Sequence, residues 1–548
     1  GNETFEKLAS MSLIANIAVY LKTKYNLDGI LLVNVVTIWS GSSSLTAIAG
    51  AIISDTYLGR FRTLFYGSIA SLLGMATMTL TAGVPQLRPT TCNEESDCPG
   101  PQKWQLGFLL SGLALLAIGA GGIRPCNIAF GADQFDTTTK KGRAQLESFF
   151  NWWYFSFTLA LVVALTVVVY IQTNVSWVLG FAIPTACLVL SIGIFLIGKN
   201  TYIILKPQGS VFVDMAKVIT AAFRKRNVDV RSASEQLYDP PIKESDSQTT
   251  KLTHTNKFRC LDKAAINTDS SELDDEGKPK NGWRLCTLQQ VEQLKLLLGM
   301  VPVWLTGIGC FVAMDQQNTI GILQAIQMNK SVGSHFKIPP GWMGLSSMIA
   351  LSIWIFIYER IYIPRAKKMT GKDKRMTMTQ RINIGIVMAI LCSLVAGIVE
   401  KHRREAALRN GSFESPLSIT LLLPQFALSG LIEAFAAVAI MEFLTTQLPE
   451  TMRTVSGAIF FLSLSAASYL NSLFVNIIYS LTLKNGKPWL GGKDLNKDTL
   501  EYFYFLIAGL GVVNFTYFNF FASRYVLNST SKRISKCESG DEEKELEV

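Results

Sequence analysis

Leu106–Gly121 reads LGFLLSGLALLAIGAG and contains no charged residue. As a helix, this stretch is apolar on every face, which a surface helix with a single apolar face is not. Similar runs recur along the chain, at Leu64–Ala82, Leu159–Val169, Val178–Ile197, Trp342–Ile357 and Ile382–Val399. Many approach the roughly 20 residues that a helix needs to span a bilayer. The repeated run predicts a polytopic α-helical membrane protein.

Composition supports this fold class. The chain has 548 residues, of which 49% are hydrophobic and 17% are charged, whereas soluble domains average about 25% charged residues. These values exclude a soluble enzyme of this length. The net charge of +10 does not indicate nucleic-acid binding, because the basic residues concentrate in particular loops, as membrane orientation requires. The clearest such loop runs from Arg360 to Arg381.

The apolar runs predict twelve membrane spans, divided six and six by a long polar stretch. The spans lie near 4–22, 31–53, 64–84, 104–127, 150–172, 177–197, 295–325, 341–361, 380–400, 416–446, 454–482 and 500–525. The predicted domains are a six-helix bundle at 1–198, a cytosolic linker at 199–290, a second six-helix bundle at 291–527 and a cytosolic tail at 528–548. We expect much of the linker to be mobile, with a lateral helix at Val211–Phe223 lying along the membrane surface.

Loop charges predict the orientation of the chain. An even number of spans places both termini on one side, which is the cytosol, because the basic segments 199–290, 360–381 and the tail all lie there. The basic run Lys401–Arg404 then lies on the outer side, where we expect it to pair with Glu400 and Glu405. The membrane is predicted to be the plasma membrane, with the vacuolar membrane as the alternative. Cys92 and Cys98 lie in a polar outer loop, and the residues leave open whether they form a disulfide.

A short motif follows the second predicted span. Residues 55–62 read DTYLGRFR, so that Asp55, Gly59, Arg60 and Arg62 stand at the spacing D-x-x-x-G-R-x-R. This segment resembles a cytosolic loop motif of the major facilitator superfamily. The alternative interpretation is a basic anchor at the membrane edge.

Longer stretches carry a resemblance that covers essentially every predicted span. They are GNETFEK at 1–7, GGIRPCN at 121–127, FGADQFD at 130–136, FFNWWYF at 149–155 and YLNS at 469–472. Together they resemble the plant nitrate/peptide transporter family, the plant branch of the proton-dependent oligopeptide transporters. The resemblance implies the major facilitator fold, with two pseudo-symmetric six-helix bundles and a substrate site between them near mid-membrane.

The first predicted span carries charges that this resemblance links to proton coupling. The family has two acids and an arginine here, and Glu3, Glu6 and Lys7 match those positions with lysine in place of arginine. On a helix the three share one face, and a charge inside a span costs roughly 2.5–3.5 kcal/mol. Lysine keeps the positive charge but lacks the bidentate fork of arginine. The alternative is a set of interfacial charges at the cytosolic mouth.

A cation lies in the fourth predicted span. Arg124 stands where the family often has lysine, and the resemblance implies a role in binding an anionic substrate. It can also pair with Glu3 or Glu6 for structural reasons, and the two roles are compatible.

The seventh predicted span contains acidic and amide side chains. Asp315 resembles a gating or proton-linked acid of oligopeptide transporters, and Gln316, Gln317 and Asn318 are candidate ligands for a polar substrate. The alternative for each amide is a polar contact between helices.

Four further charged residues complete the set of candidates. Glu433 is a single acid in the apolar tenth span, and the resemblance implies that it faces the cavity near the substrate. Glu292, Lys295 and Glu442 are candidates for salt bridges that gate the pathway. For Glu433 the alternative is burial for structural pairing.

The histidines bear on the choice of substrate. His254, His335 and His402 all lie outside the predicted spans, and the nitrate-binding histidine of one family member aligns with Met314. Histidine-mediated nitrate binding is therefore excluded, although nitrate can still use Arg124 or Lys7. The lysine form of the first-span motif resembles a subgroup of glucosinolate and other glycoside carriers, which also includes nitrate carriers.

The sequence predicts a transporter rather than an enzyme. It contains no cluster of metal ligands, no phosphate-binding loop of the type G-x-x-x-x-G-K-[ST] and no nucleophile elbow. We expect no cofactor, with a proton gradient as the energy source, and a monomer sufficient for transport. The predicted function is proton symport of a polar anionic organic solute such as a glucosinolate or other glycoside. Proton-coupled nitrate transport is the alternative, and a non-transporting sensor or a channel is a distant one.

Overall fold

A computed structural model describes most of the chain. The described residues are 2–90, 99–135, 140–204, 209–227, 237–240, 252–268, 272–274, 279–333, 336–370, 376–448, 453–484 and 488–526. Cys92, Cys98 and the predicted tail after residue 527 lie outside them. The chain divides into two units. The first comprises 1–207, 306–439 and 461–519, and the second comprises 208–305, 440–460 and 520–548.

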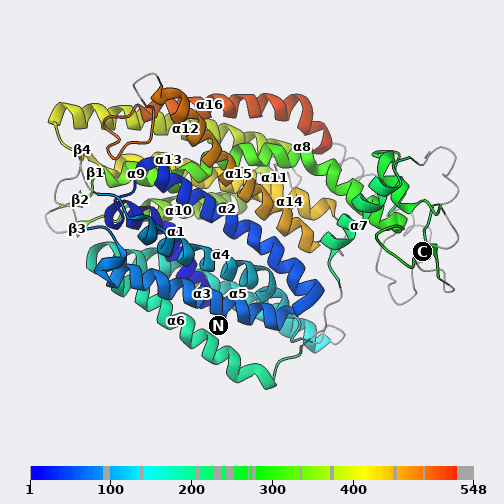
Figure 1. The fold of residues 1–548 in the computed structure, drawn as a ribbon. Coiled ribbons are helices and arrows are strands. Elements are labelled where there is room, and N and C mark those ends of the chain that lie inside the picture. The colour runs from blue at the N-terminus through cyan, green and yellow to red at the C-terminus, as the bar shows by residue number, and fades with distance from the viewer. Residues whose placement is uncertain are drawn as a thin grey trace. The chain divides into compact units, whose positions relative to one another are not determined.

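Helices dominate the part of the chain before residue 205 (Figure 1). The α-helices are α1 (Asn2–Lys24), α2 (Gly29–Ile53), α3 (Arg60–Gly83), α4 (Lys103–Ala132), α5 (Lys140–Val163) and α6 (Trp177–Ile197). Wider π-helical turns continue two of the spans, at η1 (Ser54–Leu58) after α2 and at η3 (Ala164–Val168) and η4 (Ile171–Val175) after α5, and short 3-10 turns lie at η2 (Pro85–Leu87) and η5 (Gly198–Asn200).

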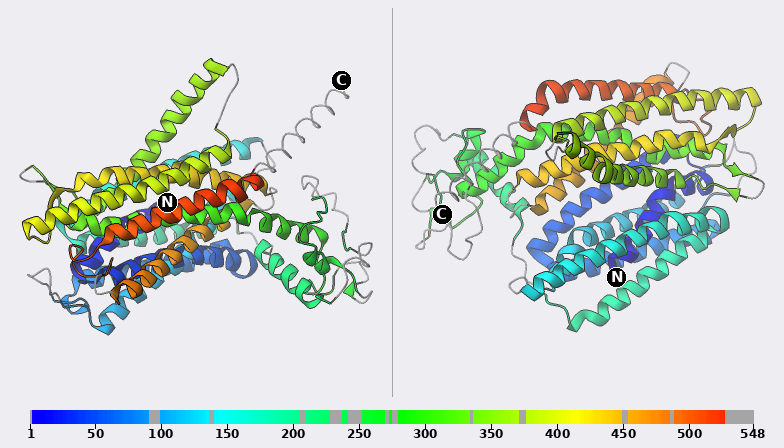
Figure 2. Two further views of the ribbon diagram at one scale, coloured as in Figure 1. Left: turned by 90° about the horizontal axis from the view of Figure 1, so that it is seen from above. Right: turned by 180° about the vertical axis from the view of Figure 1, so that it is seen from behind.

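The remainder of the chain is also helical, as the two further views show (Figure 2). Its α-helices are α7 (Val211–Arg224), α8 (Leu288–Gln316), α9 (Ile322–Ile326), α10 (Trp342–Ile357), α11 (Ile363–Thr370), α12 (Met378–Asn410), α13 (Leu423–Ile432), α14 (Val438–Gln447), α15 (Arg453–Leu483) and α16 (Leu500–Tyr517). The π-helical turns are η9 (Gln317–Gly321), η10 (Tyr358–Tyr362), η12 (Glu433–Ala437) and η14 (Phe518–Ala522), and the 3-10 turns are η7 (Arg259–Ala265) and η11 (Ile419–Leu422).

The only strands among the described residues are short. β1 (Met328–Asn329) pairs in parallel with β4 (Ser415–Ser418). β2 (Ser331–Val332) pairs antiparallel with β3 (Phe336–Lys337). All four lie in connections between helices, so the fold class is all-α, as predicted.

Each predicted span coincides with a helix. Among the described residues, 11 helical segments are long and apolar enough to cross a membrane. α1 is not one of them, although it has 23 residues, and it contains Glu6, Lys7, Lys22 and Lys24. Several helices run beyond their apolar part: α12 continues to Asn410, because the charged and alanine-rich end of this helix has good helix formers.

Because α12 extends to Asn410, the basic residues predicted in an outer loop lie on this helix. Arg403 pairs with Glu400, as expected, with a separation of 2.7 Å between Nη2 and Oε1. Arg404 pairs with Glu501 of α16, and the described residues show no ion pair between the basic run and Glu405. Both arginines therefore lie on a helix beside carboxylates rather than in a loop.

Small residues let the first helices approach closely. A Cβ atom built on Gly50 of α2 would lie 1.9 Å from the carbonyl oxygen of Gly121 of α4. Gly67 of α3 and Gly122 of α4 meet in the same way, since a Cβ on Gly122 would lie 2.9 Å from the Cα of Gly67. Such contacts are typical of helix packing in membranes, where small residues allow backbones to touch. They fix the spacing of α2, α3 and α4.

Within the first unit, the two halves of the sequence meet through α2 and α15. Ser472 Oγ donates to Asn34 Oδ1 at 2.7 Å, and Asn476 Nδ2 donates to the same oxygen at 2.8 Å. Further along the same two helices, Ser465 Oγ of α15 donates to the carbonyl oxygen of Gly41 of α2 at 2.9 Å. Neutral polar groups therefore join the halves here.

In the second unit, the described part of the linker contains helical elements that pack against one another. α7 lies at the position of the predicted lateral helix, and its buried face shares a hydrophobic core with η7 and the start of α8. The core residues are Val218, Ala221, Ala222, Ala264, Ala265, Cys286, Val291 and Leu294. Burial raises the pKa of the Cys286 thiol to about 11, so this residue packs as a neutral group.

A glycine replacement tests the helix spacing. We expect Gly50→Ala to lower the thermal unfolding midpoint of the purified protein, because the new methyl group overlaps the backbone of Gly121 and overpacking costs about 1–3 kcal/mol. The matched control is Gly193→Ala on α6, where nothing lies within 4 Å of the added Cβ. Equal midpoints for the two variants would contradict the close approach of α2 and α4.

Candidate functional site

A cavity of about 20 Å³ lies among helices α1, α2, α3, α4 and α6 of the first unit. Its polar lining comes from Glu6 and Ser10 of α1, Trp39 and Ser43 of α2, Ser71 of α3 and Arg124 of α4. The rest of the lining is apolar. Two residues predicted from the sequence, Glu6 and Arg124, thus line one cavity.

Several polar atoms in this lining have no hydrogen-bond partner among the described residues. They are Glu6 Oε2, Ser10 Oγ, Trp39 Nε1 and Arg124 Nε, all of them buried. The Glu6 residue is 3% exposed. Buried polar groups in native proteins are nearly always hydrogen-bonded, and an unpaired one costs about 1–3 kcal/mol. The cavity is therefore suited to receive a proton, a water molecule or a polar ligand group.

The other two charged residues predicted in the first span, Glu3 and Lys7, also lie on α1. Lys7 is half-buried on α1, next to Glu6, and for Glu3 the structure places the backbone on α1 but not the side chain. Glu6 and Arg124, both described, form no ion pair with each other. The structural pairing that the sequence allowed between these two is therefore not made.

The loop motif ties two helices together. Arg60 Nη1 lies 2.6 Å from each carboxylate oxygen of Asp133, at the end of α4. Asp55 is a more distant partner, with 4.0 Å between its Oδ1 and Arg60 Nε. Gly59 has a φ of 76°, which favours glycine, and Arg62 is exposed. The motif residues thus fix the connection between α2 and α3 against α4.

The acid and amides of the seventh span lie in different surroundings. Asp315 is held by α15, since Ser468 Oγ donates to its Oδ1 at 3.0 Å and Asn471 Nδ2 to its Oδ2 at 2.9 Å. Gln316 is fully buried, and neither polar atom of its side chain has a partner among the described residues. Gln317 accepts a hydrogen bond, and Asn318 is exposed.

Glu433 and Glu442 are both exposed. Glu433 begins the π-helical turn η12, and it forms no ion pair or hydrogen bond with another described residue. A carboxylate within a span is normally kept facing a water-filled space, because lipid cannot solvate it. Glu442 lies on α14, in the second unit.

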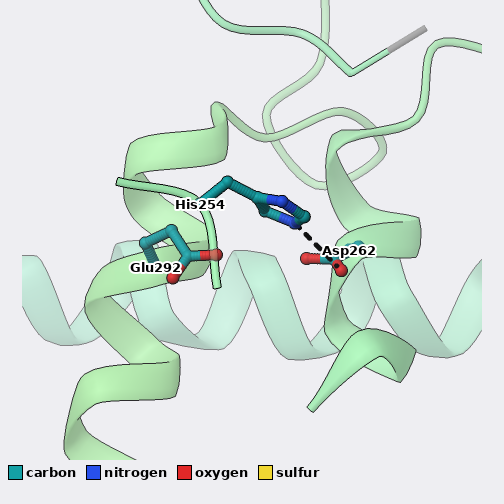
Figure 3. Close-up of side chains that lie close together, drawn as sticks. All are labelled: His254, Asp262 and Glu292. Carbon is teal, nitrogen blue, oxygen red and sulfur yellow. Dashed lines mark hydrogen bonds and ion pairs between the residues drawn. The ribbon is translucent and has the colours of Figure 1, made fainter. Parts of the chain in front are cut away.

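Glu292 and Lys295 belong to a buried cluster in the second unit. Lys295 Nζ lies 2.8 Å from Glu292 Oε1 and 2.6 Å from Asp262 Oδ1. His254 Nε2 lies 3.3 Å from Asp262 Oδ2, and Figure 3 shows this contact beside Glu292. His254, Asp262 and Glu292 offer ligand atoms within 4.8 Å of one another. Lys295 already supplies the cation that both carboxylates contact, so the cluster is an ion-pair network rather than a metal centre.

The sequence did not identify every residue of these sites. Ser10 lies one helical turn after Glu6, a spacing that places it on the same face. Trp39 and Gln425 stand in apolar runs, where an indole is usually a packing residue and an amide usually a helix–helix contact. Only the fold shows that Trp39 lines the cavity and that Gln425 contacts Gln317.

The chain matches a known family over most of its length. A family model described as PTR2, the POT family, matches residues 61–490. The protein named NRT1/PTR FAMILY 2.8 of Arabidopsis thaliana is 60% identical over 526 residues, covering 96% of this chain and 93% of that protein. NRT1/PTR FAMILY 2.13 of the same plant is 44% identical over 533 residues, covering 96% of this chain and 85% of that protein.

Two solved transporter structures have a similar fold. The in meso crystal structure of the POT family transporter PepTSo has a TM-score of 0.67 at 17% identity, covering 96% of this chain and 97% of that chain. A POT family transporter in complex with 5-aminolevulinic acid has a TM-score of 0.59 at 11% identity, covering 95% of both chains. At these identities the likeness is evidence for the fold alone.

Replacing Lys295 tests the ion-pair cluster. We expect Lys295→Met to lower the thermal unfolding midpoint, because removing one partner of a buried charge network costs about 3–5 kcal/mol. Hydrogen exchange should also rise in 252–266. The control is Lys217→Met, which removes a partly exposed pair with Asp214 that contributes about 0–1 kcal/mol. Similar shifts for both variants would show that the cluster does not hold the linker.

Proposed function

Because the chain belongs to the POT family of transporters, we propose that it is a proton-coupled symporter of a polar, anionic organic solute. A glucosinolate or another glycoside is the proposed class. The observation that carries the proposal is the cavity in which Glu6 and Arg124 each present an unpartnered buried atom. One cavity is thus lined both by Glu6, which can take up a proton, and by Arg124, which is a fixed cation.

The chemistry of the lining couples the two ligands. A proton on Glu6 turns its Oε2 from an acceptor into a donor, and the cavity then offers donors from Glu6, Ser10, Trp39 and Arg124 together with one positive charge. An acidic group of the solute accepts hydrogen bonds from these donors, whereas the ionised Glu6 carboxylate repels that acidic group. Each ligand therefore raises the affinity for the other, which is the thermodynamic basis of coupling.

The size of the cavity limits what enters it. Its volume of about 20 Å³ holds about one water-sized group. In the proposed scheme the cavity receives one oxygen of the acidic group of an organic solute, and the remainder of the solute lies outside the cavity. The same small volume favours nitrate as the second candidate, because a compact inorganic anion leaves only its other oxygens to be placed outside the cavity.

The same proposal includes the membrane in which the protein lies and the orientation of the chain across it. The plasma membrane is the proposed location, with the vacuolar membrane as the alternative, and both termini are proposed to be cytosolic. The basic loops support this orientation. Net inward movement of positive charge would gain about 2.3 kcal/mol per charge for each 100 mV of membrane potential.

A substrate panel tests the proposal most directly. Uptake of a glucosinolate, another acidic glycoside, nitrate and a neutral dipeptide would be measured in oocytes or vesicles at two external pH values. We expect accumulation of the anionic solutes to increase at the lower external pH. Saturable counterflow of the accumulated solute distinguishes a transporter from a channel. A protein that binds these solutes in reconstituted vesicles but moves none of them would be a sensor.

The coupling role of Glu6 leads to a specific expectation. Glu6→Gln keeps the size of the side chain but cannot exchange a proton, so pH-driven accumulation should fall at least about tenfold while solute counterflow persists. The control is Glu359→Gln, which changes an exposed carboxylate on η10 and should leave pH-driven uptake intact. Undiminished proton-driven accumulation in Glu6→Gln would exclude the coupling role.

A further inference from the structure

Gln425 links two turns of the seventh span. It lies on α13 and is fully buried. Its Nε2 donates to Gln317 Oε1 at 2.9 Å and to Gln324 Oε1 at 3.0 Å. Gln317 begins the π-helical turn η9, and Gln324 lies on α9 directly after it. One side chain of α13 therefore spans the π-helical turn that carries the candidate ligand amides.

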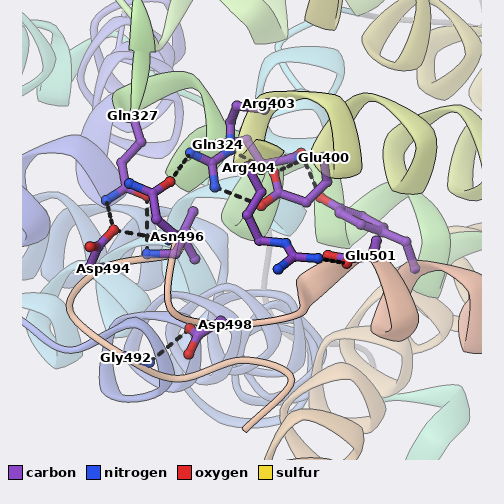
Figure 4. Close-up of polar contacts among 12 residues, drawn as sticks. Gln324, Gln327, Glu400, Arg403, Arg404, Gly492, Asp494, Asn496, Asp498 and Glu501 are labelled. Atoms are coloured by element: carbon purple, nitrogen blue, oxygen red, sulfur yellow. Dashed lines mark hydrogen bonds and ion pairs between the residues drawn. The ribbon is translucent and has the colours of Figure 1, made fainter. Parts of the chain in front are cut away.

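Gln324 also contacts a buried ion pair through the other end of its amide. Gln324 Nε2 donates to Glu400 Oε2 at 2.9 Å, and Glu400 receives two hydrogen bonds from Arg403, at 2.8 Å from Nε and 2.7 Å from Nη2. Neither charged side chain is exposed. Figure 4 shows Gln324 together with this pair. Tyr504 also donates to Gln324 Oε1, at 2.8 Å.

The ion pair fixes which way each amide faces. An arginine only donates and a carboxylate only accepts, so Gln324 must turn its nitrogen toward Glu400 and its oxygen toward Gln425. Gln425 must then donate through its nitrogen, and Gln317 must accept through its oxygen. The oxygen and nitrogen of a carboxamide are told apart by such partners. The charges of Arg403 and Glu400 thus determine which atom donates and which accepts in each amide as far as Gln317.

The series leaves two buried atoms without a partner among the described residues, the acceptor Gln425 Oε1 within it and a donor at its end. Gln317 Nε2 is buried and has no partner among the described residues, and the same holds for both polar atoms of the adjacent Gln316. An unpaired buried donor is unfavourable, and an acceptor group of a solute that bonds to it removes this penalty. We propose that Gln425 is a positioning residue for transport, which holds the Gln317 amide so that it presents a donor to the solute and never its carbonyl oxygen.

This inference rests on the proposed function and makes it more specific. A donor at Gln317 favours solutes rich in acceptor oxygens, which anionic sulfate, carboxylate and nitrate groups are. Reversing the amide would present an oxygen and repel the same groups. Gln425 would then determine the sign of the interaction at Gln317 without contacting the solute.

A structural cross-link is the competing explanation. If Gln425 only ties α13 to α9, its loss lowers stability and leaves the apparent KM for solute unchanged. If it positions Gln317, its loss raises KM, and the effect disappears once the Gln317 amide has been removed. A double-mutant cycle separates these cases.

The experiment measures proton-driven uptake of a radiolabelled glucosinolate and of nitrate by the full-length protein in vesicles. Gln425→Met, which keeps the side-chain length but removes the donor, is expected to raise KM about tenfold with little change in the maximal rate. Gln317→Met should raise KM similarly, and the double variant should be no worse than Gln317→Met alone. Gln425→Glu, which turns the donor into an acceptor, should raise KM at least as much as Gln425→Met.

The control variant is Gln327→Met. This amide is also buried, but it donates to Asp494 and does not contact Gln317. It should lower the thermal midpoint without changing KM. Unchanged KM in both Gln425 variants, or additive effects in the double variant, would overturn the inference alone. A wild-type protein that accumulates neither probe would overturn the proposed function and the inference with it, since no anionic solute would then remain for Gln317 to receive.

Discussion

The absence of water inside a bilayer is the constraint on which this structure depends. Every backbone group within a span must be bonded internally, so the apolar segments fold as helices. The same constraint applies to side chains, because a polar group that finds no partner remains at a cost of about 1–3 kcal/mol. Polar residues in the spans are therefore of two kinds, those with partners in the protein and those left for a ligand or a proton.

The two kinds lie in different places. Asp315 is held by Ser468 and Asn471, whereas Glu6 and Arg124 line a cavity with unpartnered atoms. The Glu400–Arg403 pair belongs to the first kind, and its charges set the direction of the amides that follow it. A buried ion pair contributes little net stability by itself. Here the pair fixes the orientation of the amides that follow it, each of which could otherwise exchange the positions of its oxygen and nitrogen.

Some parts of this protein were predictable from sequence and others were not. The third span, predicted near 64–84, is α3 at Arg60–Gly83, because apolar length is a local property of the chain. The helix predicted in the linker at Val211–Phe223 is α7, but the core that it shares with η7 was not predictable, since that core is built from small residues such as Ala221 and Ala264 that do not stand out in a polar segment. Glu6 and Arg124 were named through resemblance. Trp39 stands in an apolar run, where an indole is usually a packing residue, and only its place in the cavity lining makes it a candidate.

The sequence by itself determined the membrane class, the positions of the helices and the charged residues worth attention. It could do so because the cost of desolvating a residue depends mainly on that residue and its near neighbours. The tertiary structure alone decided which polar groups are paired. Gln317 and Gln425 are 108 residues apart, and Arg404 takes a partner 97 residues away in place of its neighbour Glu405. Such pairings depend on how helices pack against each other, and no local pattern in the chain encodes them.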